Sequence, residues 1–126
     1  MAESDRPLHG PGRPIESLAG EQLSAVSFVQ DYVELHFDGP VVRALTNPVV
    51  DTPEGRWHFP DAGSRDALCS LIACRVERVE HREDVHLRLD FGGGRTLTVP
   101  LDRESYPGPE AMHYQSSPTA LAQVWN

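Results

Sequence analysis

Residues 33–39, VELHFDG, and residues 85–92, VHLRLDFG, are the two stretches that decide the fold. In each of them apolar side chains alternate with polar ones, which is typical of a strand with one face buried and the other in water. Turn residues follow at 38–40 and 92–94, and glycine adopts positive φ angles there at little cost. The sequence therefore predicts two hairpins, each at the centre of a similar unit.

The similarity between the two stretches extends over residues 17–49 and 70–101, and it predicts an internal duplication. Shifted by 52 residues, RALTNPV at 43–49 matches RTLTVPL at 95–101, and Val33, Leu35 and Phe37 match Val85, Leu87 and Leu89. A structural role is sufficient to explain the shared arginine, threonine and proline, because proline ends the pairing of a strand. Each copy is expected to form a three-stranded antiparallel meander.

The predicted fold class is β-rich α+β, with six to eight strands in one sheet or partly open barrel and one short helix. The helix is expected at residues 65–73, capped by Ser64, since Leu68, Leu71 and Ile72 recur at helical spacing. Residues 51–63 are predicted to be a loop and residues 15–20 a turn. The strands are expected at residues 22–29, 33–38, 41–46, 75–80, 85–90, 95–99, 111–114 and 121–125.

The length predicts one domain, residues 15–126, preceded by a disordered tail at residues 1–14 that is rich in proline and glycine. Within the domain a linker that contains the helix covers residues 50–73, and a closing segment covers residues 102–126. No apolar run is long enough for a membrane span or follows Met1 as an export signal. We therefore expect a cytoplasmic location.

The net charge of −8 comes from 19 acidic residues against 11 basic ones, all of which are arginine. The lack of lysine excludes Schiff-base and phosphate-loop lysine chemistry. An acidic chain is repelled by nucleic acids and anionic membranes, and it suits a basic protein partner. The two cysteines, Cys69 and Cys74, are expected to be reduced thiols in or near the core, and they are too few for a zinc site.

The histidines offer a metal-binding and a catalytic hypothesis. His81, Asp84 and His86 lie close together in the sequence, but strand alternation does not direct them to one ion, so no metal is expected. A catalytic array would need the polar faces of both units to enclose a cavity. Its members would be Glu34, His36, His86 and Arg88, and the alternative is that these side chains lie on a solvated outer face. No nucleophile motif is present, so enzymatic activity is not favoured, and no cofactor is expected.

Five aromatic residues outside the two units are the candidate binding residues: Trp57, Phe59, Tyr106, Tyr114 and Trp125. Aromatic side chains in irregular segments either close the ends of a core or form an adhesive patch. The sequence leaves both alternatives open.

Parts of the sequence resemble a group of small uncharacterised proteins of high-GC bacteria. The resemblance rests on residues 18–26, 33–39, 110–111 and the LAQVW ending at 121–125, and it departs from the group at Met112 and at the glycine turn 92–94. It implies a β-rich fold and a bacterial cytoplasm, and it implies no activity.

The favoured function is that of a non-catalytic protein-binding or accessory module, which could neutralise a basic partner. The alternative is a small β-barrel ligand-binding protein or enzyme that uses the His/Glu/Asp/Arg strand face. Pairing of exposed sheet edges would also make a homodimer.

Overall fold

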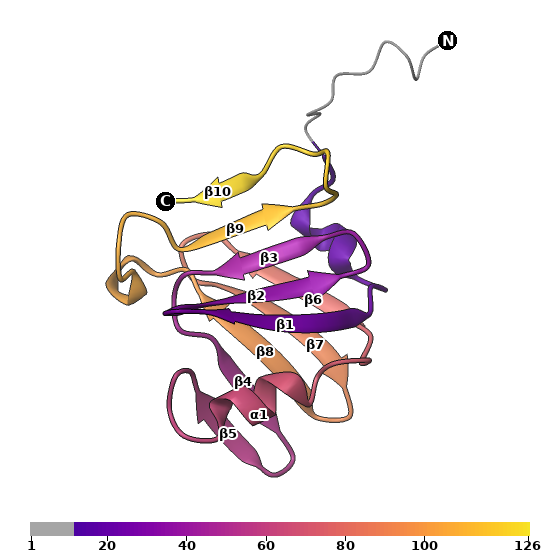
Figure 1. The fold of residues 1–126 in the computed structure, drawn as a ribbon, viewed down its shortest axis with the longest axis vertical. Helices are drawn as coiled ribbons and strands as arrows, with labels where there is room; N and C mark the ends of the chain where they lie inside the picture. Colours follow the sequence, from indigo (N-terminus) through magenta and orange to yellow (C-terminus); the bar gives the residue numbers. More distant parts are fainter. Residues whose placement is uncertain (1–11) are drawn as a thin grey trace.

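The computed structural model describes residues 12–126, and it contains two five-stranded antiparallel sheets that pack face to face (Figure 1). The first sheet has the order β1-β2-β3-β9-β10. Its strands are β1 (Leu23–Val29), β2 (Tyr32–Phe37), β3 (Val41–Ala44), β9 (Met112–Gln115) and β10 (Gln123–Trp125). The second sheet has the order β5-β4-β8-β7-β6. Its strands are β5 (Gly55–His58), β4 (Val49–Thr52), β8 (Arg95–Pro100), β7 (His86–Gly92) and β6 (Arg78–Arg82).

The β-rich fold class is confirmed, and so are the two meanders, β1-β2-β3 and β6-β7-β8. Each meander is completed by a hairpin from the other half of the chain. The β4-β5 hairpin follows the first meander but pairs with β8 of the second, and the β9-β10 hairpin follows the second meander but pairs with β3 of the first. The two halves of the chain thus exchange hairpins.

The prediction of one sheet or partly open barrel with six to eight strands is wrong in its strand count and arrangement, since ten strands form two sheets. The missed pair, β4 and β5, lies in residues 51–63, which were expected to be a loop. Pro53 lies in a tight turn and Gly55 begins the edge strand β5, whereas Pro60 and Gly63 follow that strand. Turns and edge strands tolerate both residue types.

The matched residues of the two copies do not occupy equivalent positions in the two sheets. Val33 is fully buried, whereas Val85, its partner in the sequence match, is 46% exposed in the turn before β7. In the structure Val33, Leu35 and Phe37 correspond to Leu87, Leu89 and Phe91, all of them buried on the inner faces. The topology therefore repeats, while the register of the sequence match is wrong by two residues. The duplication itself stays a prediction.

The described residues contain three short helical segments: η2 (Ile15–Leu18) before β1, α1 (Ser64–Cys69) between β5 and β6, and η3 (Arg103–Ser105) between β8 and β9. The predicted helix is thus present but ends at Cys69, and that residue is exposed while Cys74 is partly buried. None of the helices among residues 12–126 is long and apolar enough to cross a membrane. The tail predicted at 1–14 lies outside the described residues except for 12–14, where Arg13 donates its backbone N–H to Ser116 Oγ at 3.0 Å.

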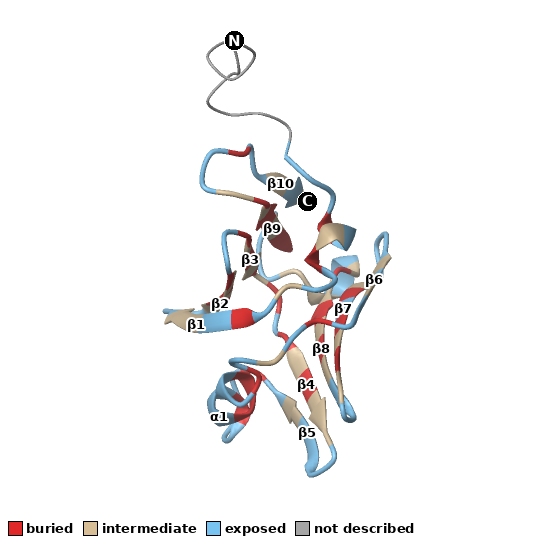
Figure 2. Cartoon of the chain, turned by 90° about the vertical axis from the view of Figure 1, so that its right-hand side faces the viewer, coloured by how far each residue is buried: buried red, intermediate tan, exposed pale blue. Residues whose placement is uncertain are grey.

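The core lies between the sheets, whose facing sides carry the buried residues (Figure 2). Cross-strand neighbours form one inner row in each sheet. The row of the first sheet consists of Phe28, Val33, Ala44, Met112 and Trp125, and that of the second sheet consists of His81, Leu87, Val99, Pro48 and Phe59. The rings at the ends of these rows meet across the sandwich and close its two open sides.

Candidate binding surface

One closed side is apolar and will be called the phenylalanine seam, consisting of Phe28, Phe59 and Arg65. The rings of Phe28 and Phe59 stack with centroids 6.0 Å apart. The guanidinium of Arg65, at the start of α1, lies 5.1 Å from the centroid of Phe59 and covers both rings. This seam joins β1 to the end of the β4-β5 hairpin. Its ring stacking and cation–π contacts close this side of the core to solvent.

The other closed side is polar and will be called the histidine seam, consisting of His81, Trp125, Glu16 and Glu83. Trp125 Nε1 donates a hydrogen bond to His81 Nε2 at 3.1 Å, and the two rings meet edge to face. Glu16 lies 3.8 Å from His81 Nδ1, and Glu83 lies 3.7 Å from His81 Nε2. This seam joins β6 to β10, at the edges of the two sheets.

The predicted aromatic binding residues divide into two sets in the structure. Phe59 and Tyr114 are buried in the core, as expected for aromatic side chains that close a core, so neither lies in an adhesive surface patch. Trp57, Tyr106 and Trp125 are partly buried and keep part of their rings at the surface. The prediction therefore retains three of its five residues as surface candidates.

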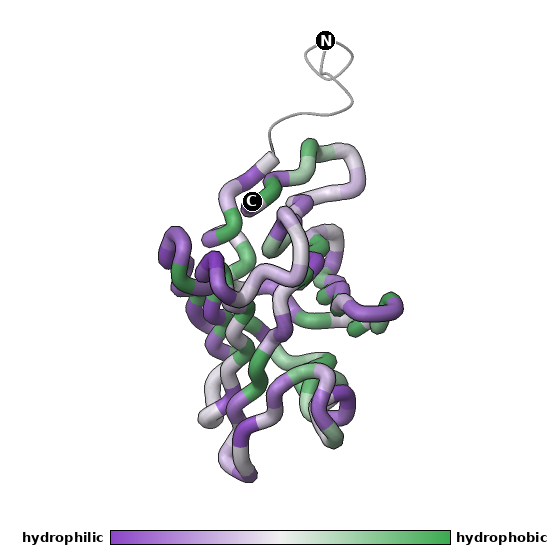
Figure 3. Tube along the Cα trace, turned by 90° about the vertical axis from the view of Figure 1, so that its left-hand side faces the viewer, coloured by the Kyte–Doolittle hydropathy of each residue, from purple (hydrophilic) through white to green (hydrophobic). Residues whose placement is uncertain are grey.

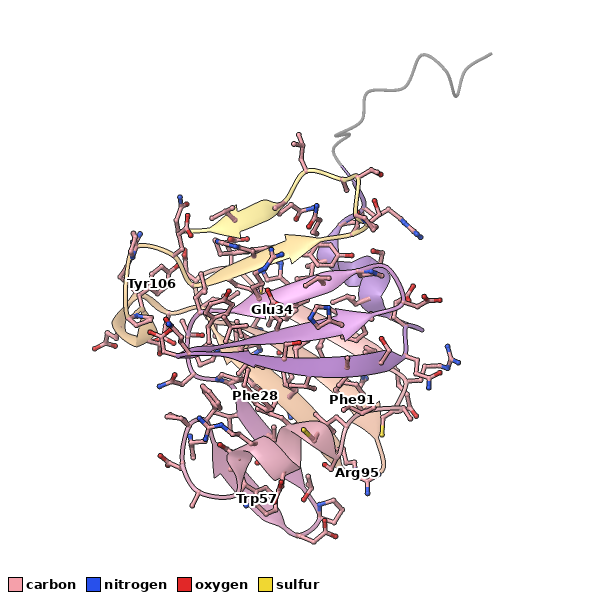
Figure 4. All side chains as sticks on the ribbon, viewed as in Figure 1. Phe28, Glu34, Trp57, Phe91, Arg95 and Tyr106 are labelled. Carbon is pink, nitrogen blue, oxygen red and sulfur yellow. The ribbon has the colours of Figure 1, made fainter. Side chains whose placement is uncertain are left out.

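Two grooves lie at the end of the sandwich where the loop 101–111 runs, beside Tyr106 in Figure 4. The first groove, of about 250 Å³, contains Glu83 and Asp84 from the turn before β7, together with Tyr106, Val124 and Trp125. The second groove, of about 330 Å³, has walls of Asp31, Tyr32, Leu45, Asn47 and residues 107–110. Among residues 12–126, four carboxylates and no arginine line the two grooves, which together will be called the acidic end.

Apolar surface accompanies these carboxylates. Val124 is 43% exposed in the edge strand β10, and Val85 is 46% exposed beside Asp84. Figure 3 views this end of the molecule and shows short hydrophobic segments next to hydrophilic turns. The only basic side chain of the adjoining loop that the structure describes, Arg103, lies 5.1 Å from the Tyr106 ring centroid. Carboxylates, exposed valines and aromatic rings thus share one surface.

A third hollow of about 360 Å³ lies between α1 and the β4-β5 hairpin, and Trp57 lines it together with Glu54 and Asp66. The Trp57 indole packs closely over Gly63, which has a φ of +87°; a Cβ at that position would lie 2.9 Å from Trp57 Nε1. The indole is therefore fixed by the backbone of the segment before α1. This hollow is distant from the loop 101–111 and separate from the acidic end.

The residues of the proposed catalytic array are not brought together. Glu34 and His36 lie on the outer face of the first sheet, where Figure 4 shows Glu34, and His86 and Arg88 lie on the outer face of the second. Glu34 accepts a hydrogen bond of 2.8 Å from Arg43 Nε and lies 3.2 Å from His36 Nε2. These side chains form ion pairs on a solvated surface, and the core separates them from His86.

The second outer face is also a network of paired charges. His86 Nε2 lies 2.7 Å from Glu80 Oε2, and this hydrogen bond lowers the pKa of the Glu80 carboxyl below its ordinary value. The hollow there, of about 360 Å³, combines Arg78 and Arg88 with Glu80 and Asp90. Its charges balance, in contrast with those of the acidic end.

Metal binding by His81, Asp84 and His86 has no geometric support. His81 faces Trp125 and His86 faces Glu80, on opposite sides of the second sheet. Among the described residues, no group of three or more His, Cys, Asp or Glu side chains is arranged to hold a metal ion.

The sequence did not indicate the acidic end, because its carboxylates come from two separate turns and one long loop. Only the exchange of hairpins brings β10 next to the turn before β7. The available signal was the position of Asp31 and Asp84 in equivalent turns of the two units. Comparisons with protein-family models, with curated proteins and with solved structures found no match for this chain.

Proposed function

We propose that the protein is a non-catalytic binding module whose acidic end holds an extended, arginine- or lysine-bearing segment of a partner protein. The observation that carries the proposal is the lining of the two grooves, to which the described part of the chain contributes four carboxylates and three aromatic rings but no arginine. Carboxylates attract the cationic head of such a side chain, and aromatic faces hold it by cation–π attraction.

The edge strand β10 supports an extended conformation for the partner segment. An edge strand exposes unpaired backbone groups, and a peptide can add to it as a further strand while its alternate side chains enter neighbouring pockets. The exposed side chain of Val124 offers apolar contact beside those pockets. Backbone hydrogen bonds to β10 and apolar contacts with Val85 and Val124 would supply the affinity. The carboxylates would supply the preference for a basic sequence.

A short synthetic peptide of alternating arginine and valine tests this proposal, with a peptide of alternating glutamate and valine as its control. Backbone amide shifts in NMR spectra should change at the turn before β7, at residues 107–110 and along β10. The double variant Glu83→Gln/Asp84→Asn should bind the basic peptide about threefold to tenfold more weakly, which is the effect of losing two partly solvated charge contacts.

The matched control is Asp38→Asn/Glu77→Gln, which makes the same change in net charge at turns outside the acidic end. Its affinity for the basic peptide should stay within about twofold of the native value at moderate salt. Equal weakening by both double variants would show that only net charge matters and would overturn the proposal. Equal binding of the glutamate peptide, or shifts confined to the outer sheet faces, would also overturn it.

A further inference from the structure

The histidine seam and the phenylalanine seam occupy equivalent places in the two halves of the fold. Phe28 pairs with Val33 on its neighbouring strand, and His81 pairs in the same way with Leu87. Phe59 lies opposite Pro48 at one end of its row, and Trp125 lies opposite Met112 at the corresponding end of the other. A titratable imidazole therefore stands where the other half of the fold has an apolar ring.

The hydrogen bond in this seam fixes the protonation state of His81. An indole N–H can only donate, so His81 Nε2 must accept and carries no proton while the 3.1 Å contact exists. Protonation of the imidazole places hydrogens on both ring nitrogens, and Nε2 then faces another donor. The Trp125 bond cannot persist in that state.

Two carboxylates near His81 can stabilise the protonated, positively charged imidazole. The charged groups facing the ring are Glu16 from η2, near Nδ1, and Glu83 from the turn after β6, near Nε2. The neighbouring strand contributes Leu87, and β10 contributes Trp125. A protonated ring can thus exchange Trp125 for Glu83 by a small movement, since that carboxylate is already 3.7 Å away. Only 14% of the His81 side chain is exposed, so bulk water contributes little to either state.

We infer that His81 is a proton-operated latch for the C-terminal strand: the neutral imidazole holds Trp125 and β10 against β6, and the protonated imidazole releases them. The strand is suited to this because it has three residues and, within residues 12–126, pairs with β9 alone. Histidine is the side chain whose ordinary titration falls between about pH 5 and 8. The inference concerns β10 itself, and it stands whether or not the acidic end binds a basic segment.

NMR observation of the Trp125 indole N–H across about pH 5 to 8 tests the latch. At the high end of this range the N–H should be protected from hydrogen exchange, and at the low end its protection, relative to the intrinsic exchange rate at the same pH, should fall at least tenfold while its resonance shifts. The Trp57 indole, which has no histidine partner in the described structure, serves as the internal reference. Protection of Trp125 that does not change over this range would overturn the inference.

Two variants assign the effect to His81. His81→Phe restores the pair of apolar rings found in the other seam, and Trp125→Phe keeps a ring while removing the N–H. In both variants the protection of the β9 and β10 amides, relative to intrinsic exchange, should no longer depend on pH. In His86→Gln, on the outer face, that dependence should remain. Persistence of the pH dependence in Trp125→Phe would overturn the inference even if His81→Phe did not fold.

Discussion

The hydroxyl of Thr46 donates a hydrogen bond of 2.6 Å to the carbonyl oxygen of Pro100. Thr46 lies where the chain leaves the first sheet for the second, and Pro100 ends β8. Both residues belong to the repeated R-x-L-T-x-P motif, one to each copy. The two motifs thus meet at the crossing, and Thr46, 2% exposed, secures it.

Replacing Thr46 by valine should destabilise the protein by about 1–3 kcal/mol, because the carbonyl of Pro100 would lose a buried partner without a compensating change in shape. Urea denaturation at neutral pH measures this cost. Thr98→Val is the matched control, since Thr98 is only partly buried and its hydroxyl has no hydrogen bond among the described residues. Equal costs for the two variants would contradict the role assigned to Thr46.

Removing a ring from the phenylalanine seam should lower the free energy of unfolding more than the loss of the Thr46 hydroxyl does. Phe59 is 3% exposed and stacks on Phe28, so Phe59→Ala should lower the free energy of unfolding by about 3–5 kcal/mol. Val124→Ala, at the exposed surface, should change it by less than about 0.5 kcal/mol. Thermal denaturation of the two variants compares them directly, and a Phe59 cost as small as that of Val124 would show that the seam is open in solution.

Alkaline pH should destabilise the protein through Tyr114. Burial raises the pKa of the Tyr114 phenol above its ordinary value of about 10, although the Ser17 hydroxyl, 3.1 Å away, acts in the opposite direction. A raised pKa in the folded state contributes stability that is complete below the pKa of the unfolded chain and is lost as the pH rises through the folded value. The free energy of unfolding should therefore fall above about pH 10.

Unfolding at neutral and alkaline pH measures this loss, and Tyr114→Phe should reduce the alkaline fall. At neutral pH that variant should cost about 1 kcal/mol through the lost bond to Ser17. Tyr32→Phe, at a partly exposed position, is the control that should retain the alkaline fall. If Tyr32→Phe reduced the alkaline fall and Tyr114→Phe retained it, the loss of stability would be assigned to Tyr32.

The ion pairs on the outer face of the first sheet should contribute little to the free energy of unfolding. Glu34→Gln removes the ion pair with Arg43, whose side chain is 31% exposed, and pairs of this kind contribute about 1 kcal/mol or less. The loss should shrink further in high salt, because the remaining charges are screened. Denaturation at two salt concentrations checks this, and a cost of several kcal/mol would indicate a structural role that the exposure of the pair does not explain.

Period-two alternation predicted the meander strands well because it reports directly on which face is buried. Leu35 and Leu87 were expected inside, and both are fully buried. The alternation could not show that the two meanders form separate sheets, since each would look the same in one continuous sheet. Nor could it show that Glu34 and His86 lie on different faces of the molecule, which depends on how the sheets stack.

The pairing of β4 with β8 and that of β9 with β3 depend on contacts between residues far apart in the sequence. Trp57 and Arg56 lie in a short edge strand with one paired neighbour, and its pattern of exposure is too irregular to indicate a strand. The histidine seam is another such case, because His81 and Trp125 are 44 residues apart. Local sequence carries no information about which distant ring a histidine will meet.

The reciprocal exchange of the β4-β5 and β9-β10 hairpins bears on how a duplicated ancestor of this chain would have folded. If the predicted duplication occurred, the half-length ancestor had one meander and one hairpin, and in the exchanged arrangement its hairpin paired with the meander of a second copy. Any such forerunner would have folded as an obligate pair, and fusion of its two genes would have converted a concentration-dependent association into a single, concentration-independent folding event.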